Sequence, residues 1–263
     1  MDQGVIEYIA NVFDIPKLAQ PVSVVQMPLP LTRLAEIPLD SSVNQCQGFC
    51  YNSKKDVFVL ACINSENTKQ IIYEINPTTF KVVAKYEYSH KKLLGHMNTL
   101  TYNPNNNRYY TTNAVVDGYI VTPIEADSMI VEAPIRLKEK VFNFAFDKDR
   151  NEYVSIVPLT NSHRTINYYD ANFNRIRSFT IDAEHTDLNN NGAYAANGNT
   201  IFTTLTTFVS VDNEGVVKNI IPYTSGMEVE DMDYRNGQMY VAVNRKGKVE
   251  IYSLPTLPFS VNA

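Results

Sequence analysis

The feature that most constrains this chain is a sequence repeat of roughly 45 residues that runs through almost its whole length. Each copy contains an aromatic residue, then a polar turn, then a second segment rich in β-branched and aromatic residues. A period of this size, with several short strands in each copy, is typical of a β-propeller blade. The repeat therefore predicts an all-β propeller with one aromatic anchor in each blade. The anchors are Tyr51, Tyr102, Phe146, Tyr194 and Tyr234, which are 51, 44, 48 and 40 residues apart.

The repeat also predicts how the ring closes. A third strand, such as residues 70–78, follows each anchor hairpin, and a fourth strand, such as residues 80–88 or 129–137, follows in four of the five copies. The fifth copy stops after its third strand. Residues 31–39 precede the first anchor just as the other fourth strands precede theirs. We therefore expect a five-bladed β-propeller over residues 31–263, closed by the N-terminal strand, so that no blade lacks its outer strand and only short, protected edges remain.

The first thirty residues lie outside the repeat. Their apolar residues have helical spacing up to Asp14-Ile15-Pro16, where the proline disfavours helix in the residue before it. Three further prolines up to Pro30 predict an extended strap. The short helix either packs on the propeller's own surface or binds a partner or a symmetry mate, because its apolar face is expected to be buried against another surface. The partner-binding residues would be Val5, Ile6, Ile9 and Phe13.

The composition and charge of the chain make several classes of protein less favoured. There is no run of eighteen apolar residues that predicts a membrane span, and the pattern at the start of the sequence predicts no Sec-type signal peptide. The net charge is −5, and no cluster of basic residues favours nucleic acid as a partner. The three cysteines, at positions 46, 50 and 62, predict small buried side chains rather than a disulfide framework.

The starts of the inner strands of a propeller face its central channel, so the polar residues just before each anchor are candidate ligands. They form an amide-rich set with one acidic pair, which offers too few carboxylates for a glycosidase and predicts no catalytic residue. Such a set either holds water and its own neighbours or binds a hard cation, so Ca²⁺ in the channel is a candidate and no other cofactor is expected. The candidates are Gln47, Asn98, Asn143, Asn191, Glu230 and Asp231.

His96 lies in the run Gly95-His96-Met97-Asn98 and joins this candidate site at the channel mouth. It either binds a ligand or metal there or uses a ring nitrogen to hold the backbone of a neighbouring blade.

The first two blades resemble a known family. The segments QGFCYNSKKDVFVL and GHMNTLTYNPNNNRYY show a Gln-Gly inner strand followed by a Gly-His-x-Asn-x-x-x-Tyr-Asn strand. This pattern, over about residues 45–125, is similar to the platform propeller of receptor-binding tail proteins in small staphylococcal podophages, and to the helveticin J-like bacteriocins. Met97 and Thr99 depart from the family pattern.

The resemblance implies a non-enzymatic virion component that binds a cell-wall glycopolymer or teichoic acid, contacts other virion proteins and forms a homo-oligomer, such as a trimer. Two alternatives stay open: a scaffold for protein partners or a helveticin-like protein, cytoplasmic or secreted by a non-Sec route, and a hydrolase or lyase with a site in the channel. The anchors are interpreted as core residues, which leaves other tyrosines and asparagines as candidate ligand contacts. These are Tyr88, Tyr109, Tyr223 and the turn Asn105–Asn107.

Overall fold

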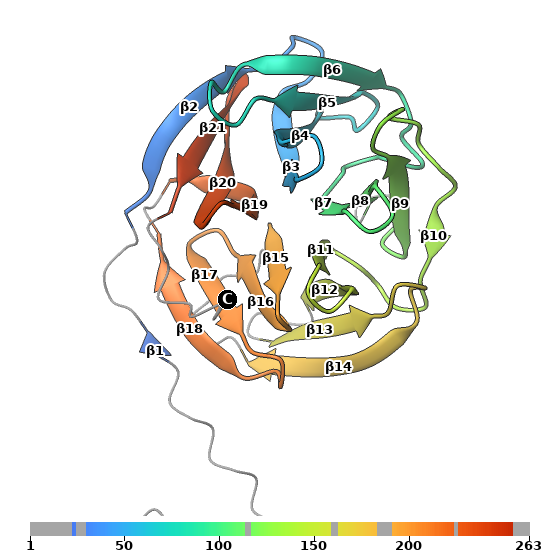
Figure 1. The fold of residues 1–263 in the computed structure, drawn as a ribbon, viewed down its shortest axis with the longest axis vertical. Coiled ribbons are helices and arrows are strands. Elements are labelled where there is room, and N and C mark those ends of the chain that lie inside the picture. Colours follow the sequence, from blue (N-terminus) through green and yellow to red (C-terminus); the bar gives the residue numbers. More distant parts are fainter. Residues whose placement is uncertain are drawn as a thin grey trace, which may run out of the picture.

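Five antiparallel sheets surround a central axis in the computed structural model, which describes residues 23–24, 30–113, 117–158, 163–182, 191–223 and 226–254 (Figure 1). The predicted five-bladed β-propeller is confirmed. The described residues contain no α-helix, and none of them forms a helix long and apolar enough to cross a membrane. The predicted N-terminal helix, with Val5, Ile6, Ile9 and Phe13, lies outside the described residues.

The strands of each blade follow one another from the axis outward. Blade one contains β3 (Gln45–Asn52), β4 (Val57–Ile63), β5 (Gln70–Ile75) and β6 (Val82–Tyr88). Blade two contains β7 (Leu100–Asn103), β8 (Arg108–Thr112), β9 (Ile120–Glu125) and β10 (Ile135–Arg136). Blade three contains β11 (Asn143–Asp147), β12 (Glu152–Pro158), β13 (His163–Tyr169) and β14 (Arg175–Asp182). Blade four contains β15 (Ala193–Ala196), β16 (Asn199–Thr203), β17 (Thr207–Val211) and β18 (Val217–Pro222). Blade five contains β19 (Glu228–Arg235), β20 (Gln238–Arg245), β21 (Lys248–Ser253) and the N-terminal β2 (Thr32–Pro38).

The N-terminal strand closes the ring as the sequence predicts. Strand β2 pairs antiparallel with β21, so the start and the end of the chain share blade five (Figure 1). Ile37 is buried in a hydrophobic cluster that also contains Phe58 of blade one, so the closing strand contributes to the core between two blades. Ion pairs Arg33–Glu250 at 3.0 Å and Lys248–Glu36 at 2.5 Å join the two strands.

Part of the predicted strap forms a further strand. Strand β1 (Ser23–Val24) pairs in parallel with β18 and extends blade four to five strands. The outer strand of blade two is much shorter than residues 129–137. Only β10 and an isolated bridge from Val131 to Ile124 form there, because Pro134 has no N–H to donate and Met129 turns inward, with a φ of 57°.

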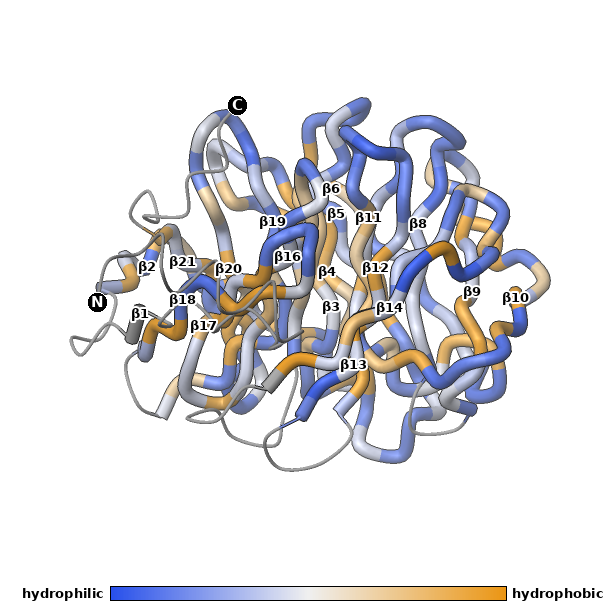
Figure 2. Tube along the Cα trace, turned by 90° about the horizontal axis from the view of Figure 1, so that it is seen from below, coloured by the Kyte–Doolittle hydropathy of each residue, from blue (hydrophilic) through white to orange (hydrophobic). Residues whose placement is uncertain are grey.

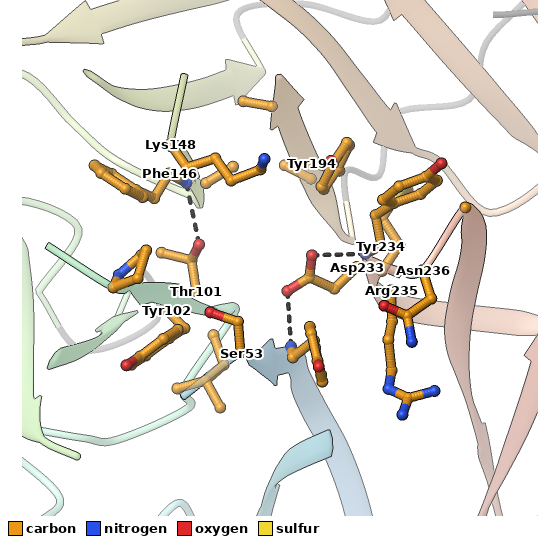
Figure 3. A pocket seen from close by; sticks show the side chains of 18 residues that line it. Ser53, Thr101, Tyr102, Phe146, Lys148, Tyr194, Asp233, Tyr234, Arg235 and Asn236 are labelled. Carbon is orange, nitrogen blue, oxygen red and sulfur yellow. Dashed lines mark hydrogen bonds between the residues drawn. The ribbon is translucent and has the colours of Figure 1, made fainter. Parts of the chain in front are cut away.

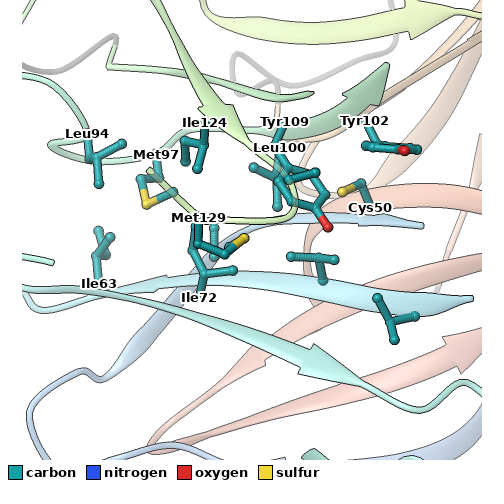
Figure 4. Packing of buried hydrophobic residues seen from close by; sticks show 14 residues of the cluster. Cys50, Ile63, Ile72, Leu94, Met97, Leu100, Tyr102, Tyr109, Ile124 and Met129 are labelled. Atoms are coloured by element: carbon teal, nitrogen blue, oxygen red, sulfur yellow. The ribbon is translucent and has the colours of Figure 1, made fainter. Parts of the chain in front are cut away.

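The core consists of apolar clusters between neighbouring blades. Figure 4 shows the cluster between blades one and two, in which Met97, Tyr109 and Met129 meet. Figure 2 shows polar loops at the two ends of the molecule and apolar segments along the strands between them. All three cysteines are buried and unpaired by disulfides, as predicted.

Two of the tyrosines predicted as exposed candidate ligand contacts are core residues instead. Tyr109 is fully buried, and its hydroxyl accepts a hydrogen bond from Asn52 Nδ2 at 2.6 Å. Tyr223 is buried too, and its hydroxyl donates to the carbonyl oxygen of Thr204. The error has one cause: both faces of a blade pack against neighbouring blades, so strand alternation does not expose every second residue. The hydroxyl of half-buried Tyr88 donates to the Met129 carbonyl at 2.8 Å, whereas Asn105 and Asn106 are exposed.

Candidate functional site

A cavity of about 390 Å³ opens at the end of the ring where the inner strands finish (Figure 3). All five anchor aromatics line it, together with residues of the turns that follow them. Our interpretation of the anchors as core residues is confirmed for Tyr102 and Phe146 and is wrong for Tyr234, which is exposed, whereas Tyr51 and Tyr194 are partly buried. Tyr102 and Phe146 are mostly buried, whereas Tyr234 is 43% exposed. The lining turn residues are Ser53, Pro104, Lys148, Asn236 and Gly237.

The residue after the anchor explains why three of the aromatic rings are held at the cavity. In blades one and two it is an asparagine, whose Oδ1 accepts backbone N–H groups of the following turn at 2.8–3.0 Å. The same Asn52 and Asn103 side chains donate to tyrosine hydroxyls of the next blade, at 2.6 and 2.7 Å. In blade three, Asp147 accepts from the turn and from the Gly198 N–H of blade four. The aromatic-Asn/Asp pair thus fixes both the hairpin and the contact between blades.

The Asp231 carboxylate lies beneath the cavity and joins the inner strands. It is fully buried, and its two oxygens accept N–H groups from blades one, two, four and five. Thr99 Oγ1 lies 3.2 Å from Asp231 and 3.1 Å from the Phe144 carbonyl, which brings blade three into the network. Burial raises the pKa of Asp231 to about 8, and the backbone hydrogen bonds act in the opposite direction. The N–H donors are Phe49 at 3.0 Å, Leu100 at 2.9 Å, Ala193 at 3.2 Å and Met232 at 3.0 Å.

A second carboxylate, that of Asp233, lines the cavity itself (Figure 3). One oxygen accepts the Tyr51 N–H and the other the Tyr234 N–H, both at 2.7 Å. Burial raises the pKa of Asp233 to about 7, and these two hydrogen bonds lower it. A carboxyl group that titrates near neutrality in a cavity can hold a cation or exchange a proton.

None of the predicted channel residues lines the cavity: four of them lie on inner strands, whereas Asn98 and Asn191 precede theirs. Asp231 alone of them accepts hydrogen bonds from the backbone of lining residues. Gln47 and Glu230 occupy equivalent bulges in β3 and β19. Glu230 is buried, and burial together with Glu228 raises its pKa well above the usual range. Asn143 Nδ2 donates to the Asn191 carbonyl. The Asn98 N–H donates to Thr112.

The structure places His96 in the loop between blades one and two. Its Nδ1 lies 2.9 Å from Asn67 Oδ1 of blade one, and burial lowers its pKa. The expected contact with a neighbouring blade is present, but its partner is a side-chain amide rather than the backbone. Among the described residues, no three His, Cys, Asp or Glu side chains gather as metal ligands. Calcium in the channel, held by amide oxygens, stays a prediction.

No known protein family and no curated protein matches this sequence. Solved structures match its fold. A glutaminyl cyclase from Myxococcus xanthus is 12% identical, with a TM-score of 0.59, and the match covers 87% of this chain and 100% of that one. The WD40 repeats of RRP9 are 8% identical, with a TM-score of 0.49, over 86% of this chain and 100% of that one. At 12% identity the match to the glutaminyl cyclase shows a shared fold alone.

Sequence reasoning missed the residues that give the cavity its chemistry. Asp233 stands directly before the fifth anchor, and Lys148 and Arg235 stand one or two residues after an anchor. The one available signal was the repeat itself: residues next to equivalent anchors in a closed ring must converge on the axis.

Proposed function

We propose that this protein is a non-enzymatic binding protein of a virion tail, and that its central cavity binds a unit of a host cell-surface glycopolymer. The observation that carries the proposal is the ring of five aromatic side chains around one cavity. Aromatic faces pack against the apolar C–H faces of sugar rings, and polar groups at the rim can bind hydroxyls. The volume of about 390 Å³ lies in the range of about 300–1,000 Å³ common for small-ligand sites.

The number of carboxylate side chains in the cavity favours binding over glycoside hydrolysis. Most glycosidases place two carboxyl groups on either side of the scissile bond, one as acid and one as base or nucleophile. Asp233 is the one carboxylate in the described lining. Asp231 is committed to backbone N–H groups and is fully buried.

The virion placement rests on the resemblance of residues 45–125 to podophage tail propellers. A glycopolymer or teichoic acid is then the ligand, other virion proteins are partners, and a trimer is the expected assembly. A tail component needs many weak contacts in parallel, and an oligomer supplies them through effective concentration.

Tyr234→Ala is expected to weaken binding to purified host cell walls by about tenfold or more, which is the effect of losing about 1.4 kcal/mol. Tyr234 is a suitable probe because it is 43% exposed, so its loss leaves the core packed. The matched control is Tyr119→Ala, which removes a partly exposed ring outside the cavity. Walls stripped of teichoic acid measure the contribution of that polymer. Equal binding by wild type and Tyr234→Ala would exclude the cavity as the site.

A second candidate is acid–base catalysis by Asp233, because a carboxyl group with a pKa of about 7 suits proton transfer at neutral pH. The glutaminyl cyclase that shares the fold suggests the reaction to test. A peptide with an N-terminal glutamine is expected to release no ammonia when incubated with this protein. Ammonia release that disappears in Asp233→Asn would replace the binding proposal with a catalytic one.

A further inference from the structure

The cavity surrounds an acidic side chain with aromatic rings. Figure 3 shows the Asp233 carboxylate pointing into the space between Tyr102, Phe146, Tyr194 and Tyr234. The rings of Tyr194 and Tyr234 have centroids 6.1 Å apart and an interplanar angle of 37°. Because the two ring planes are tilted, their faces are not parallel, as in a partly open aromatic cage. The ring faces carry the negative part of the aromatic quadrupole, so they add to the potential of the carboxylate.

Asp233 has no cationic partner among the residues that the structure describes. Its two hydrogen bonds come from neutral backbone N–H groups. The basic residues of the lining are paired elsewhere. Lys148 Nζ lies 3.3 Å from Asp149, and Arg235 Nε lies 2.9 Å from Asp56. Neither of these two carboxylates belongs to the cavity lining. The cavity therefore contains an acid that forms no ion pair with any side chain among the described residues, although two basic residues line the same cavity.

We propose that the cavity selects a ligand that bears an ammonium group, with Asp233 as its counterion and Tyr194 and Tyr234 as cation–π contacts. This inference rests on the proposed function of the cavity as a binding site, and it names the chemical class of the bound unit: an amino-substituted segment of the polymer. An ammonium group in a partly dehydrated cavity interacts with a carboxylate far more strongly than it does in bulk water. An anionic unit would instead place its charge beside Asp233.

Binding is expected to depend on pH through Asp233. The other titratable groups near it are the Tyr51 and Tyr194 hydroxyls and the Cys50 thiol, and burial raises the pKa of each. They stay protonated at neutral pH. Lys148 and Arg235 are the basic groups of the lining, and Asp231 lies below it with a pKa of about 8. A raised pKa means that Asp233 loses its proton as the pH rises through about 7. A permanently charged ligand should thus bind about tenfold more tightly at about pH 8 than at about pH 6.

The test uses choline, whose charge is independent of pH, and its neutral carbon isostere dimethylbutanol. Calorimetric titration of the full chain is expected to show choline binding about tenfold or more tightly than the isostere. Asp233→Asn should abolish both this preference and its pH dependence. Asp127→Asn, at an exposed aspartate outside the cavity, should leave them unchanged. Equal affinity for choline and the isostere would overturn the proposal, and so would a preference that survives in Asp233→Asn. If Asp233→Asn fails to fold, the wild-type comparison of the two ligands decides.

A second arm separates this inference from the proposed function. Cell-wall fragments are compared before and after acetylation of their amines, which removes the positive charge and keeps the polymer. We expect acetylation to weaken binding about tenfold. Equal binding of both samples would leave glycopolymer binding standing and overturn the ammonium inference. Choline binding without binding of either fragment sample would support the ammonium site and overturn glycopolymer binding.

Discussion

Asp231→Ala is expected to lower the free energy of unfolding by about 4 kcal/mol or more, a loss in the exceptional range for a single substitution. The reason is the number of groups that the carboxylate satisfies. Four backbone N–H groups from four different blades point at its two oxygens. Each buried donor left without an acceptor costs about 1–3 kcal/mol. Water that enters the space left by the side chain would recover part of this loss.

Urea denaturation followed by tyrosine fluorescence measures the effect. The matched control is Asp127→Ala, which removes an exposed aspartate that accepts one hydrogen bond from Asn107 and is expected to change stability by less than about 0.5 kcal/mol. Asp231→Asn should fall between the two, because the amide keeps one acceptor and turns a donor toward the other N–H groups. If Asp231→Ala melts like the control, the carboxylate does not hold the inner strands together.

Deletion of residues 1–40 is expected to abolish cooperative unfolding. The deletion removes β2, which leaves the edge of β21 unpaired and takes Ile37 out of the cluster between blades five and one. An open ring exposes strand edges that also favour aggregation. Calorimetric melting of the truncated chain should show a broad transition or none.

The control for this deletion is a shorter one. Removing residues 1–20 keeps β1, β2 and all five blades, so a sharp transition is expected. A chain without residues 1–40 that melts as sharply as the full chain would show that closure by β2 is dispensable. The comparison separates the loss of β1 and β2 from any contribution of the first twenty residues.

The two predictions concern one physical problem. A propeller is a ring of separate sheets, and most of its hydrogen bonds lie within a blade rather than between blades. Something must therefore couple the blades. Here β2, which is continuous in the chain with blade one, pairs with β21 of blade five and closes the ring, and Asp231 connects the inner strands at the axis. The cavity with Asp233 lies directly above this connection, so its aromatic walls are held by a rigid base.

The sequence alone determined the blade count, the closing strand and the buried cysteines. These features depend on local patterns: a strand's composition, its turn and its distance from the next anchor. The sequence also marked Glu230 and Asp231 as the acidic pair of the channel. It did not predict different roles for Asp231 and Asp233, because residues two positions apart on a strand lie on the same face.

Tertiary structure alone decided what those carboxylates do. Asp231 meets the N–H groups of strands that lie up to 182 residues away in the chain, whereas Asp233 faces a space that exists after all five anchors converge. The same convergence turned Tyr51 and Tyr234 toward a shared cavity, and packing on both faces of each blade buried Tyr109 and Tyr223. A strand pattern reports which residues share a face of a strand. It cannot report whether that face meets a neighbouring blade, a cavity or water, because this depends on where the other blades lie.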